Sequence, residues 1–283
     1  MELLTLRKVL AAIDLEDGSS AAWNSARDLA AAAGAELHAL HVMGDNVQVA
    51  SAEAELKRIG VSRSVAEVHL LSGDPAHAIG LTADRLGVDV IVLGPHRERQ
   101  NGARASGLGS TALAVVTNAA APCLVTSTPL RLPLSHVIVA VDLSDTARGT
   151  LLVALSWASA LRSREAAPTQ LTALHVIDTR SSAQDEARAR AVDEALSPIR
   201  RAAGEWAGVT LRSETIRAEN AAEGIRAHAT VHPAELVILG TRGLGDEPIG
   251  RLGSTSVEVM RRIEFPILLV PPAMWKQRRD ALA

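Results

Sequence analysis

The feature that most constrains this chain is an internal repeat. Five short blocks of the first half recur in the same order in the second half, separated by 128, 134, 146, 144 and 144 residues. The matching blocks are Val9–Asp14 and Val137–Asp142, Leu40–Val42 and Leu174–Val176, Val90–Gly94 and Leu236–Gly240, Gly109–Thr111 and Gly253–Thr255, and Pro122–Val125 and Pro266–Leu269. Ordered self-similarity indicates two copies of one structural unit. We expect domains at 1–128 and 136–283, joined by a Pro-containing linker at 129–135.

Each copy has the pattern of an α/β domain, in which short β-branched runs alternate with longer segments rich in Ala and Leu. In the first copy, strands are predicted at 8–13, 36–42, 65–71, 89–94 and 123–126, and helices near 18–33, 47–59, 75–86 and 108–119. Strands that are apolar on both faces and separated by helices indicate a parallel sheet. Each domain is therefore predicted to be a five-stranded parallel sheet flanked by helices.

Composition excludes several classes of protein. Aromatic residues make up only 2% of the 283 residues and the net charge is −3, which argues against nucleic-acid binding by stacking or by a basic surface. The single cysteine, Cys123, excludes an intramolecular disulfide and is predicted to be buried and inert. The uncharged stretch 105–130 is too polar for a membrane span. We expect a cytoplasmic protein without a signal peptide or a membrane partner.

Candidate ligand-binding residues follow the predicted strands. Asp142, Val176 and Gly240 end the first, second and fourth strands of the second copy. Because open parallel sheets bind ligands at the carboxyl ends of their strands, these residues are expected to meet at one small ligand. The equivalent strand ends of the first copy are Asp14, Val42 and Gly94.

The segment after the fourth strand of the second copy is rich in glycine. Five glycines occur in the fourteen positions from Gly240 to Gly253, and Ser254 and Thr255 then open a predicted helix. Backbone N–H groups and hydroxyls at a helix start favour phosphate, and Arg242 would add charge-assisted hydrogen bonds. A surface loop with capping hydroxyls explains the same glycines equally well.

One spacing pattern favours the phosphate-binding loop over a plain surface loop. It is Gly-x2-Gly-x9-Gly-[Ser/Thr], at Gly240, Gly243, Gly253 and Ser254. Together with the Asp that ends the first strand and the Leu-His-Val strand, it resembles the universal stress protein family. The resemblance covers almost the whole chain as a tandem pair. It implies two Rossmann-like domains, of the adenine nucleotide α-hydrolase-like kind, in an ATP-binding stress-response or signalling protein.

The resemblance also implies roles for individual residues. Ala140 and Asp142 would contact adenosine, and Val176 would pack on adenine. The glycine loop, with Gly240, Gly243, Gly253, Ser254 and Thr255, would wrap the phosphates, and Asp142 would contact Mg²⁺ or Mn²⁺ indirectly. The expected site set is Ala140, Val141, Asp142, Val176, Leu239, Gly240, Arg242, Gly243, Gly253, Ser254 and Thr255. Family members commonly dimerise through the last strand, so the two domains are expected to pair internally, and a homodimer and an unknown protein partner stay open.

The first copy departs from the family pattern. Arg97 stands where the second glycine belongs, and Gly94 and Gly109 are 15 residues apart, against 13 in the second copy. A Cβ at position 97 restricts the backbone that the loop requires. A weaker site is therefore expected here, from Asp14, Val42, Gly94, Gly109, Ser110 and Thr111.

Rapid catalysis is not predicted. The chain has neither a P-loop Gly-x4-Gly-Lys-[Ser/Thr] nor a Gly-x-Ser-x-Gly elbow, and it lacks the Ser-Gly-Gly-x-Asp-Ser loop of adenylating enzymes. We expect a non-enzymatic binding protein. Slow ATP hydrolysis, or autophosphorylation at Ser254 or Thr255, is one alternative, and a nucleotide-independent interaction scaffold is the other.

Nine histidines raise the question of a metal site, and none is predicted. His38 and His41 are three apart on a strand and face opposite sides. His228 and His232 have a helical spacing but lack a His-Glu-x-x-His pattern, and zinc normally needs three or four ligands. His41 and His175 occupy the same position in the two copies and are interpreted as packing residues with a hydrogen-bonded ring.

Overall fold

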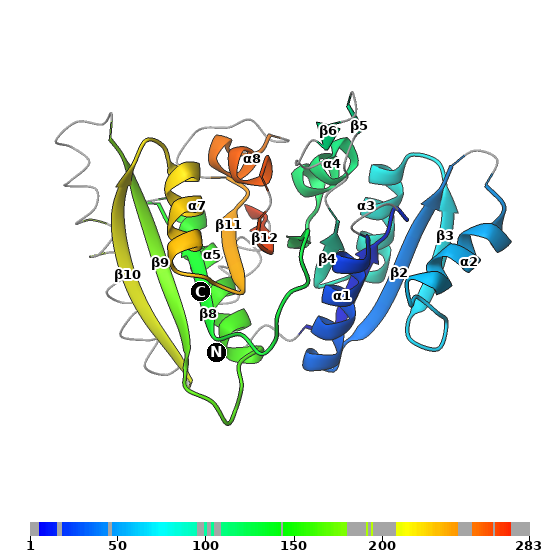
Figure 1. Ribbon diagram of the computed structural model, residues 1–283, viewed down its shortest axis with the longest axis horizontal. Helices are drawn as coiled ribbons and strands as arrows, with labels where there is room; N and C mark the ends of the chain where they lie inside the picture. Colours follow the sequence, from blue (N-terminus) through cyan, green and yellow to red (C-terminus); the bar gives the residue numbers. More distant parts are fainter. Residues whose placement is uncertain are drawn as a thin grey trace. The chain divides into compact units, whose positions relative to one another are not determined.

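The computed structural model describes residues 6–15, 19–44, 47–94, 99–100, 103–104, 109–142, 144–179, 191, 194, 208–242, 251–262 and 264–272. They divide into two compact units, one formed by residues 6–131 and the other chiefly by residues 132–260 and 267–272. Figure 1 shows that helices pack against a sheet in each unit. Within the described part of the chain, no helix has the length and apolar character needed to cross a membrane.

The N-terminal unit contains β1 (Lys8–Ala12), α1 (Ser19–Ala33), β2 (Glu36–Met43), α2 (Val49–Arg58), β3 (Glu67–Ser72), α3 (Pro75–Leu86), β4 (Val90–Leu93), α4 (Ser110–Asn118) and β7 (Cys123–Val125). Its strands are parallel throughout and lie in the order β3-β2-β1-β4-β7. A short antiparallel pair, β5 (Arg99–Gln100) and β6 (Ala103–Arg104), precedes α4.

The C-terminal unit repeats this arrangement. It contains β8 (His136–Ala140), α5 (Asp145–Ala160), β9 (Thr169–Asp178), β10 (Val209–Ala218), α7 (Ala221–Val231), β11 (Leu236–Gly240), α8 (Ser254–Met260) and β12 (Ile267–Val270). Its strands are again parallel, in the order β10-β9-β8-β11-β12.

The strand order explains where a ligand can enter. In each unit the chain moves outward over three strands and then returns to the other side of the first strand, so β1 and β4, or β8 and β11, flank a topological switch point. Right-handed crossovers place α1 and α2 on one face of the N-terminal sheet and α3 and α4 on the other. The connections diverge at the switch point and leave a crevice at the carboxyl ends of the strands.

The core explains the high content of small apolar residues. Strands β4 and β12 are buried along their whole length, and the Ala-rich helices α1 and α5 pack on the sheets. One tryptophan in each of these helices, Trp23 and Trp157, has at most 1% of its surface exposed. The remaining core is almost entirely aliphatic, which is typical of a sheet covered on both faces.

The architecture predicted from the sequence is confirmed: both units are five-stranded parallel sheets flanked by helices. Predicted strands and helices of the N-terminal unit agree with the observed ones to within about two residues at each end. The β5–β6 pair was not predicted. Gly243 and Arg97 lie outside the described residues, so the predictions at these two positions stay predictions.

A carboxylate fastens the start of the first strand in each unit. Glu235 accepts hydrogen bonds from the backbone N–H groups of Ser135 and His136, at 3.2 and 2.7 Å. Asp89, at the equivalent position of the first copy, accepts from the N–H groups of Arg7 and Lys8, at 2.7 and 2.9 Å. The carboxylate therefore joins the first and fourth strands at their amino ends, opposite the crevice.

We expect Glu235→Ala to lower the free energy of unfolding by about 1–2 kcal/mol, because two backbone donors lose a charged acceptor and gain only water. Urea denaturation followed by circular dichroism measures this loss. Glu223→Ala, which changes an exposed glutamate on α7 of the same unit, is the control. A Glu235→Ala midpoint equal to that of wild type would contradict the fastening role.

Candidate functional site

A cleft of about 220 Å³ lies at the carboxyl ends of β8, β9 and β11 in the C-terminal unit. It is closed by the starts of α5, α7 and α8. The residues that line it are Ala140, Val141, Asp142, Ser144, Ala147, Thr150, Leu174, His175, Val176, Ala221, Ile225, Leu239, Gly240, Arg242, Gly253, Ser254, Thr255 and Ser256. Every residue of the expected site set that the structure describes is among them.

The end of β8 directs a carboxylate toward the start of α5. Asp142 accepts hydrogen bonds from the backbone N–H of Ser144, at 2.9 Å, and from the hydroxyl of Ser144. The same hydroxyl oxygen accepts from the N–H of Ala147, at 3.1 Å, and so caps α5. These contacts hold Asp142 at a fixed place on the cleft wall, half-exposed and able to accept from a ligand hydroxyl.

A histidine joins the ends of the first and second strands in both units. Nδ1 of His175 on β9 donates to the carbonyl oxygen of Val141, at 3.0 Å. Nδ1 of His41 on β2 makes the same bond to Ile13, at 2.8 Å. The interpretation of these histidines as packing residues with a hydrogen-bonded ring is therefore confirmed, and neither is positioned as a free general base by its Nδ1.

The glycine that ends β11 allows the chain to turn sharply into the wall of the cleft that contains the start of α8. A Cβ at Gly240 would lie 3.0 Å from the carbonyl oxygen of Arg242 and 3.1 Å from Oγ1 of Thr150, which is closer than side chains normally pack. Ser256 donates to the carbonyl oxygen of Gly240, at 2.7 Å, and the N–H of Gly253 donates to Thr241, at 2.8 Å. These bonds hold the start of α8 against the end of β11.

The wall of the cleft between β9 and α7 depends on a glycine that was not predicted. Gly224 is buried on α7, and a Cβ there would lie 2.6 Å from Cγ1 of Val176 and 3.0 Å from Cβ of Ala218. Only glycine lets α7 approach β9 so closely. Ala221 and Ile225 of α7 also line the cleft. The repeat offset of 146 residues pairs Ala221 and Ile225 with Pro75 and Ile79, which line the equivalent cleft of the N-terminal unit, but no sequence motif marks either pair.

The N-terminal unit has a related cleft of about 180 Å³. It is lined by Ala12, Ile13, Asp14, Leu40, Val42, Pro75, Ile79, Leu93, Gly94, Thr111 and Ala112. Four residues of the weaker predicted set are among them, whereas Gly109 and Ser110 are not. Ala112 takes the place that Ser256 has in the C-terminal unit, and Pro75 that of Ala221, so the described wall of this cleft is less polar.

The helical histidine pair is explained by a local hydrogen bond to a carboxylate. Nε2 of His228 lies 2.8 Å from a carboxylate oxygen of Glu214 on β10, and the rings of His228 and His232 have their centres 4.7 Å apart. The pair packs on the outer strand of the C-terminal unit and does not line the cleft.

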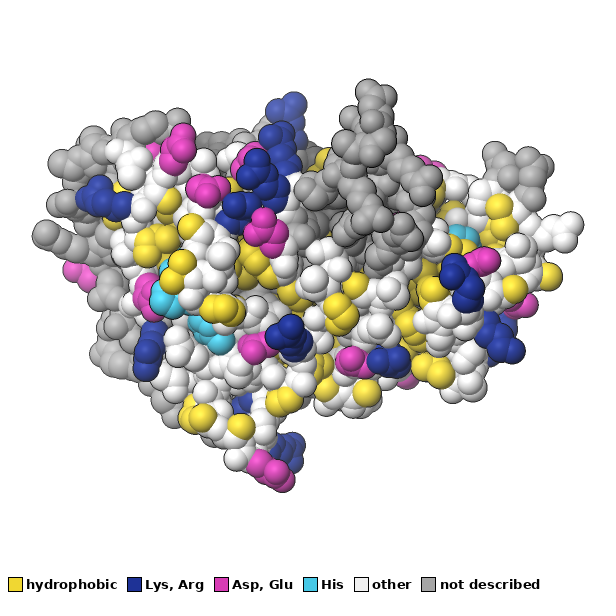
Figure 2. Space-filling view, in the orientation of Figure 1, with side chains coloured by type: hydrophobic (Ala, Val, Ile, Leu, Met, Phe, Trp, Pro, Cys, Tyr) yellow, Lys and Arg dark blue, Asp and Glu magenta, His cyan; other side chains and the backbone are white. Residues whose placement is uncertain are grey.

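Basic and acidic side chains are interspersed on the described surface in Figure 2, as the near-neutral net charge leads one to expect.

Burial in β7 raises the pKa of the Cys123 thiol from 9.0 to about 12. Thiolate is the reactive form, and a raised pKa removes it at every pH below that value. We expect a disulfide reagent at pH 8 to label the folded protein at least tenfold more slowly than the protein in urea. The release of its chromophore measures both rates. Rapid labelling of the folded chain would contradict the burial of this thiol.

Comparisons with known proteins agree on one family. The model of the universal stress protein family matches residues 45–127 and 133–271. A universal stress protein from Archaeoglobus fulgidus DSM 4304 superposes with a TM-score of 0.63 at 18% identity, covering 94% of this chain and 97% of that one. A functionally unknown protein from Pseudomonas aeruginosa PAO1 gives 0.66 at 18% identity, covering 98% and 96%. No protein of curated function matches the sequence significantly.

Proposed function

Since this chain belongs to the universal stress protein family, we propose that the cleft of the C-terminal unit binds an adenine nucleotide such as ATP. The observation that carries the proposal is the chemical character of three successive parts of the cleft lining. The cleft combines an apolar slot, a carboxylate and a polar wall with an arginine and two adjacent hydroxyls. A nucleotide needs these three surfaces in this order, for its base, its ribose and its phosphates.

The apolar slot suits the base. Leu174 and Val176 of β9 and Ile225 of α7 line this part of the cleft, and their apolar side chains would pack against a planar ring. Asp142 at the end of β8 would accept from a ribose hydroxyl. In this arrangement the ribose lies at the switch point between β8 and β11, where doubly wound sheets bind their ligands.

The polar wall suits phosphate. Arg242 follows β11, and the hydroxyls of Ser254 and Thr255 lie beside it in the same cleft. A guanidinium and hydroxyl donors together form charge-assisted hydrogen bonds to phosphate oxygens. Mg²⁺ or Mn²⁺ that accompanies the nucleotide would neutralise phosphate charge, with Asp142 as the carboxylate nearest to it.

In this proposal the nucleotide acts as a signal rather than as a substrate. Binding joins β8, β9, α7 and α8, which would stabilise one arrangement of these elements and alter a surface that a protein partner in a stress response recognises. Slow hydrolysis or phosphate transfer to Ser254 or Thr255 is the second candidate, because both hydroxyls would lie next to the phosphates. Labelled ATP distinguishes the two: we expect neither release of phosphate nor uptake of label.

Calorimetric titration of ATP into the full-length protein, with Mg²⁺ present, tests the proposal. We expect about one equivalent to bind per chain, since the N-terminal cleft offers fewer polar groups. The protein is first unfolded and refolded to remove any nucleotide that co-purified. A folded chain that binds no ATP, ADP or AMP would refute nucleotide binding and favour the interaction scaffold.

A further inference from the structure

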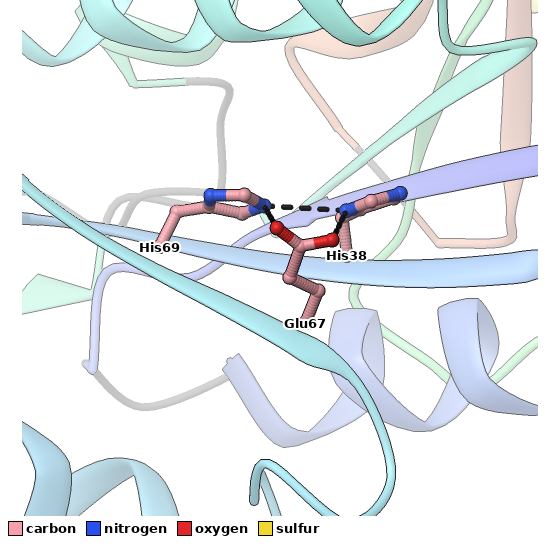
Figure 3. A group of neighbouring side chains, drawn as sticks. All are labelled: His38, Glu67 and His69. Carbon is pink, nitrogen blue, oxygen red and sulfur yellow. Dashed lines mark hydrogen bonds and ion pairs between the residues drawn. The ribbon is translucent and has the colours of Figure 1, made fainter.

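A group of metal-ligating side chains lies in the N-terminal unit, at the opposite end of the sheet from its cleft. His38 lies near the start of β2, and Glu67 and His69 lie near the start of β3. The parallel register sets His38 beside Glu67 and Leu40 beside His69, so alternate residues bring the three side chains to one face. Figure 3 shows the two rings side by side with the Glu67 carboxylate reaching between them.

The distances within this group are those of a coordination shell. Nδ1 of His38 lies 3.2 Å from Nε2 of His69 and 3.5 Å from one carboxylate oxygen of Glu67. Nε2 of His69 lies 3.9 Å from the other oxygen of Glu67. Ligand atoms that surround a tetrahedral zinc at about 2.0–2.1 Å are about 3.3 Å from one another. The first two distances are already close to this value. The third, between His69 and Glu67, needs only a rotation of the exposed glutamate side chain.

We propose that His38, Glu67 and His69 bind a divalent transition-metal cation of the zinc type, with water completing the coordination. Two imidazoles and one carboxylate are a ligand set that zinc and its neighbours prefer, whereas Mg²⁺ and Ca²⁺ prefer oxygen ligands alone. Three protein ligands leave a coordination position open to solvent. No metal site was predicted, because spacing along the chain does not reveal a group of side chains that forms across two strands.

The surroundings of His38 supply a second argument. The side chain of His38 is only 5% exposed, and its other ring nitrogen, Nε2, is buried without a hydrogen-bond partner among the described residues. A cation at Nδ1 would place the proton of the ring on Nε2. The carboxylate of Glu36 lies 3.7 Å from Nε2, and metal-bound histidines commonly donate from their second ring nitrogen to such an outer carboxylate.

Charged side chains surround the group. Glu36 and Glu67 supply negative charge that offsets the positive charge of Arg63 and Arg85.

Titration of zinc chloride into the full-length protein, after treatment with a chelator, tests this inference by calorimetry. We expect the wild type to bind one equivalent that His69→Gln and Glu67→Ala each weaken at least tenfold. His77→Gln on α3 and Glu55→Ala on α2 are the matched controls in the same unit, and both should bind zinc as wild type does. Cobalt in place of zinc should give the intense visible absorption of a tetrahedral site in the wild type and the controls only.

Two results would overturn the inference. One is a folded wild type that binds no zinc, which would leave a hydrogen bond between the two rings as the whole role of the group. The other is zinc binding that both ligand variants retain at full affinity. Glu67 has 65% of its side chain exposed, so Glu67→Ala is expected to fold even where a histidine variant does not, and circular dichroism checks this.

Discussion

Replacing Gly253 with Asp should weaken ATP binding by the full-length protein about 100-fold or more. Gly253 lines the cleft beside Ser254 and Thr255, and its N–H is already bonded to Thr241. A carboxylate there would face the proposed phosphates, and two like charges about 4 Å apart repel by about 4 kcal/mol at an effective dielectric constant of about 20. A loss of about 2.7 kcal/mol corresponds to a factor of 100 in affinity. Calorimetry with ATP and Mg²⁺ measures it.

Two control variants test whether the loss of affinity comes from the charge of the new side chain rather than its volume, and whether it is specific to the C-terminal unit. Gly253→Asn adds nearly the same volume without the charge and should retain more affinity than Gly253→Asp. Gly109→Asp makes the same change at the equivalent position of the N-terminal unit, where the residue caps α4, and should leave one equivalent of ATP bound. If Gly253→Asp binds ATP as tightly as wild type, the phosphates do not lie at this wall.

Replacing Gly224 with Ala should destabilise the protein, whereas the same change at Gly80 should stabilise it. Both glycines lie inside helices, so both variants gain up to about 1 kcal/mol of helix propensity. A Cβ at Gly224 meets Val176 at 2.6 Å, but a Cβ at Gly80 meets nothing within 4 Å. Overpacking typically costs about 1–3 kcal/mol, and Val176 is β-branched and cannot turn away easily. We expect the two variants to differ in unfolding free energy by about 2–3 kcal/mol.

Urea denaturation followed by circular dichroism compares the two variants. A second measurement links stability to the proposed site: Gly224→Ala displaces Val176 and should weaken ATP binding, while Gly80→Ala should leave it unchanged. Equal midpoints for the two variants would show that α7 can move away from β9 at little cost. Weakened stability with unchanged ATP affinity would remove Val176 from the proposed base slot.

Much of the fold follows from local patterns in the sequence. Apolar runs of four to seven residues alternate with Ala-rich helical segments in the first copy, so they predict strands and helices directly. The repeat strengthens this secondary-structure prediction, because the same order of strands and helices occurs in both halves of the chain. The residues that end strands, such as Asp142 and Gly240, could also be predicted, since every parallel strand delivers its carboxyl end to the same edge of the sheet.

Contacts between elements could not be predicted in the same way. Gly224 is an ordinary helix residue in the sequence, and its role appears only because α7 lies against Val176. Thr150 and Ser256 likewise belong to the cleft through the packing of α5 and α8 on the strand ends. The residue pattern within one helix does not indicate which strand or helix packs against it.

The sequence by itself determined two α/β domains, the order of their strands and helices, and the strand ends at which a ligand can enter, because these depend on residues that are near one another in the chain. The tertiary structure alone decided which side chains from distant segments meet. His38 and His69 are 31 residues apart and face one another only because β2 and β3 pair in one particular register. A shift of one residue would turn the side chains of one strand to the opposite face, and the long-range packing of the whole unit fixes that register.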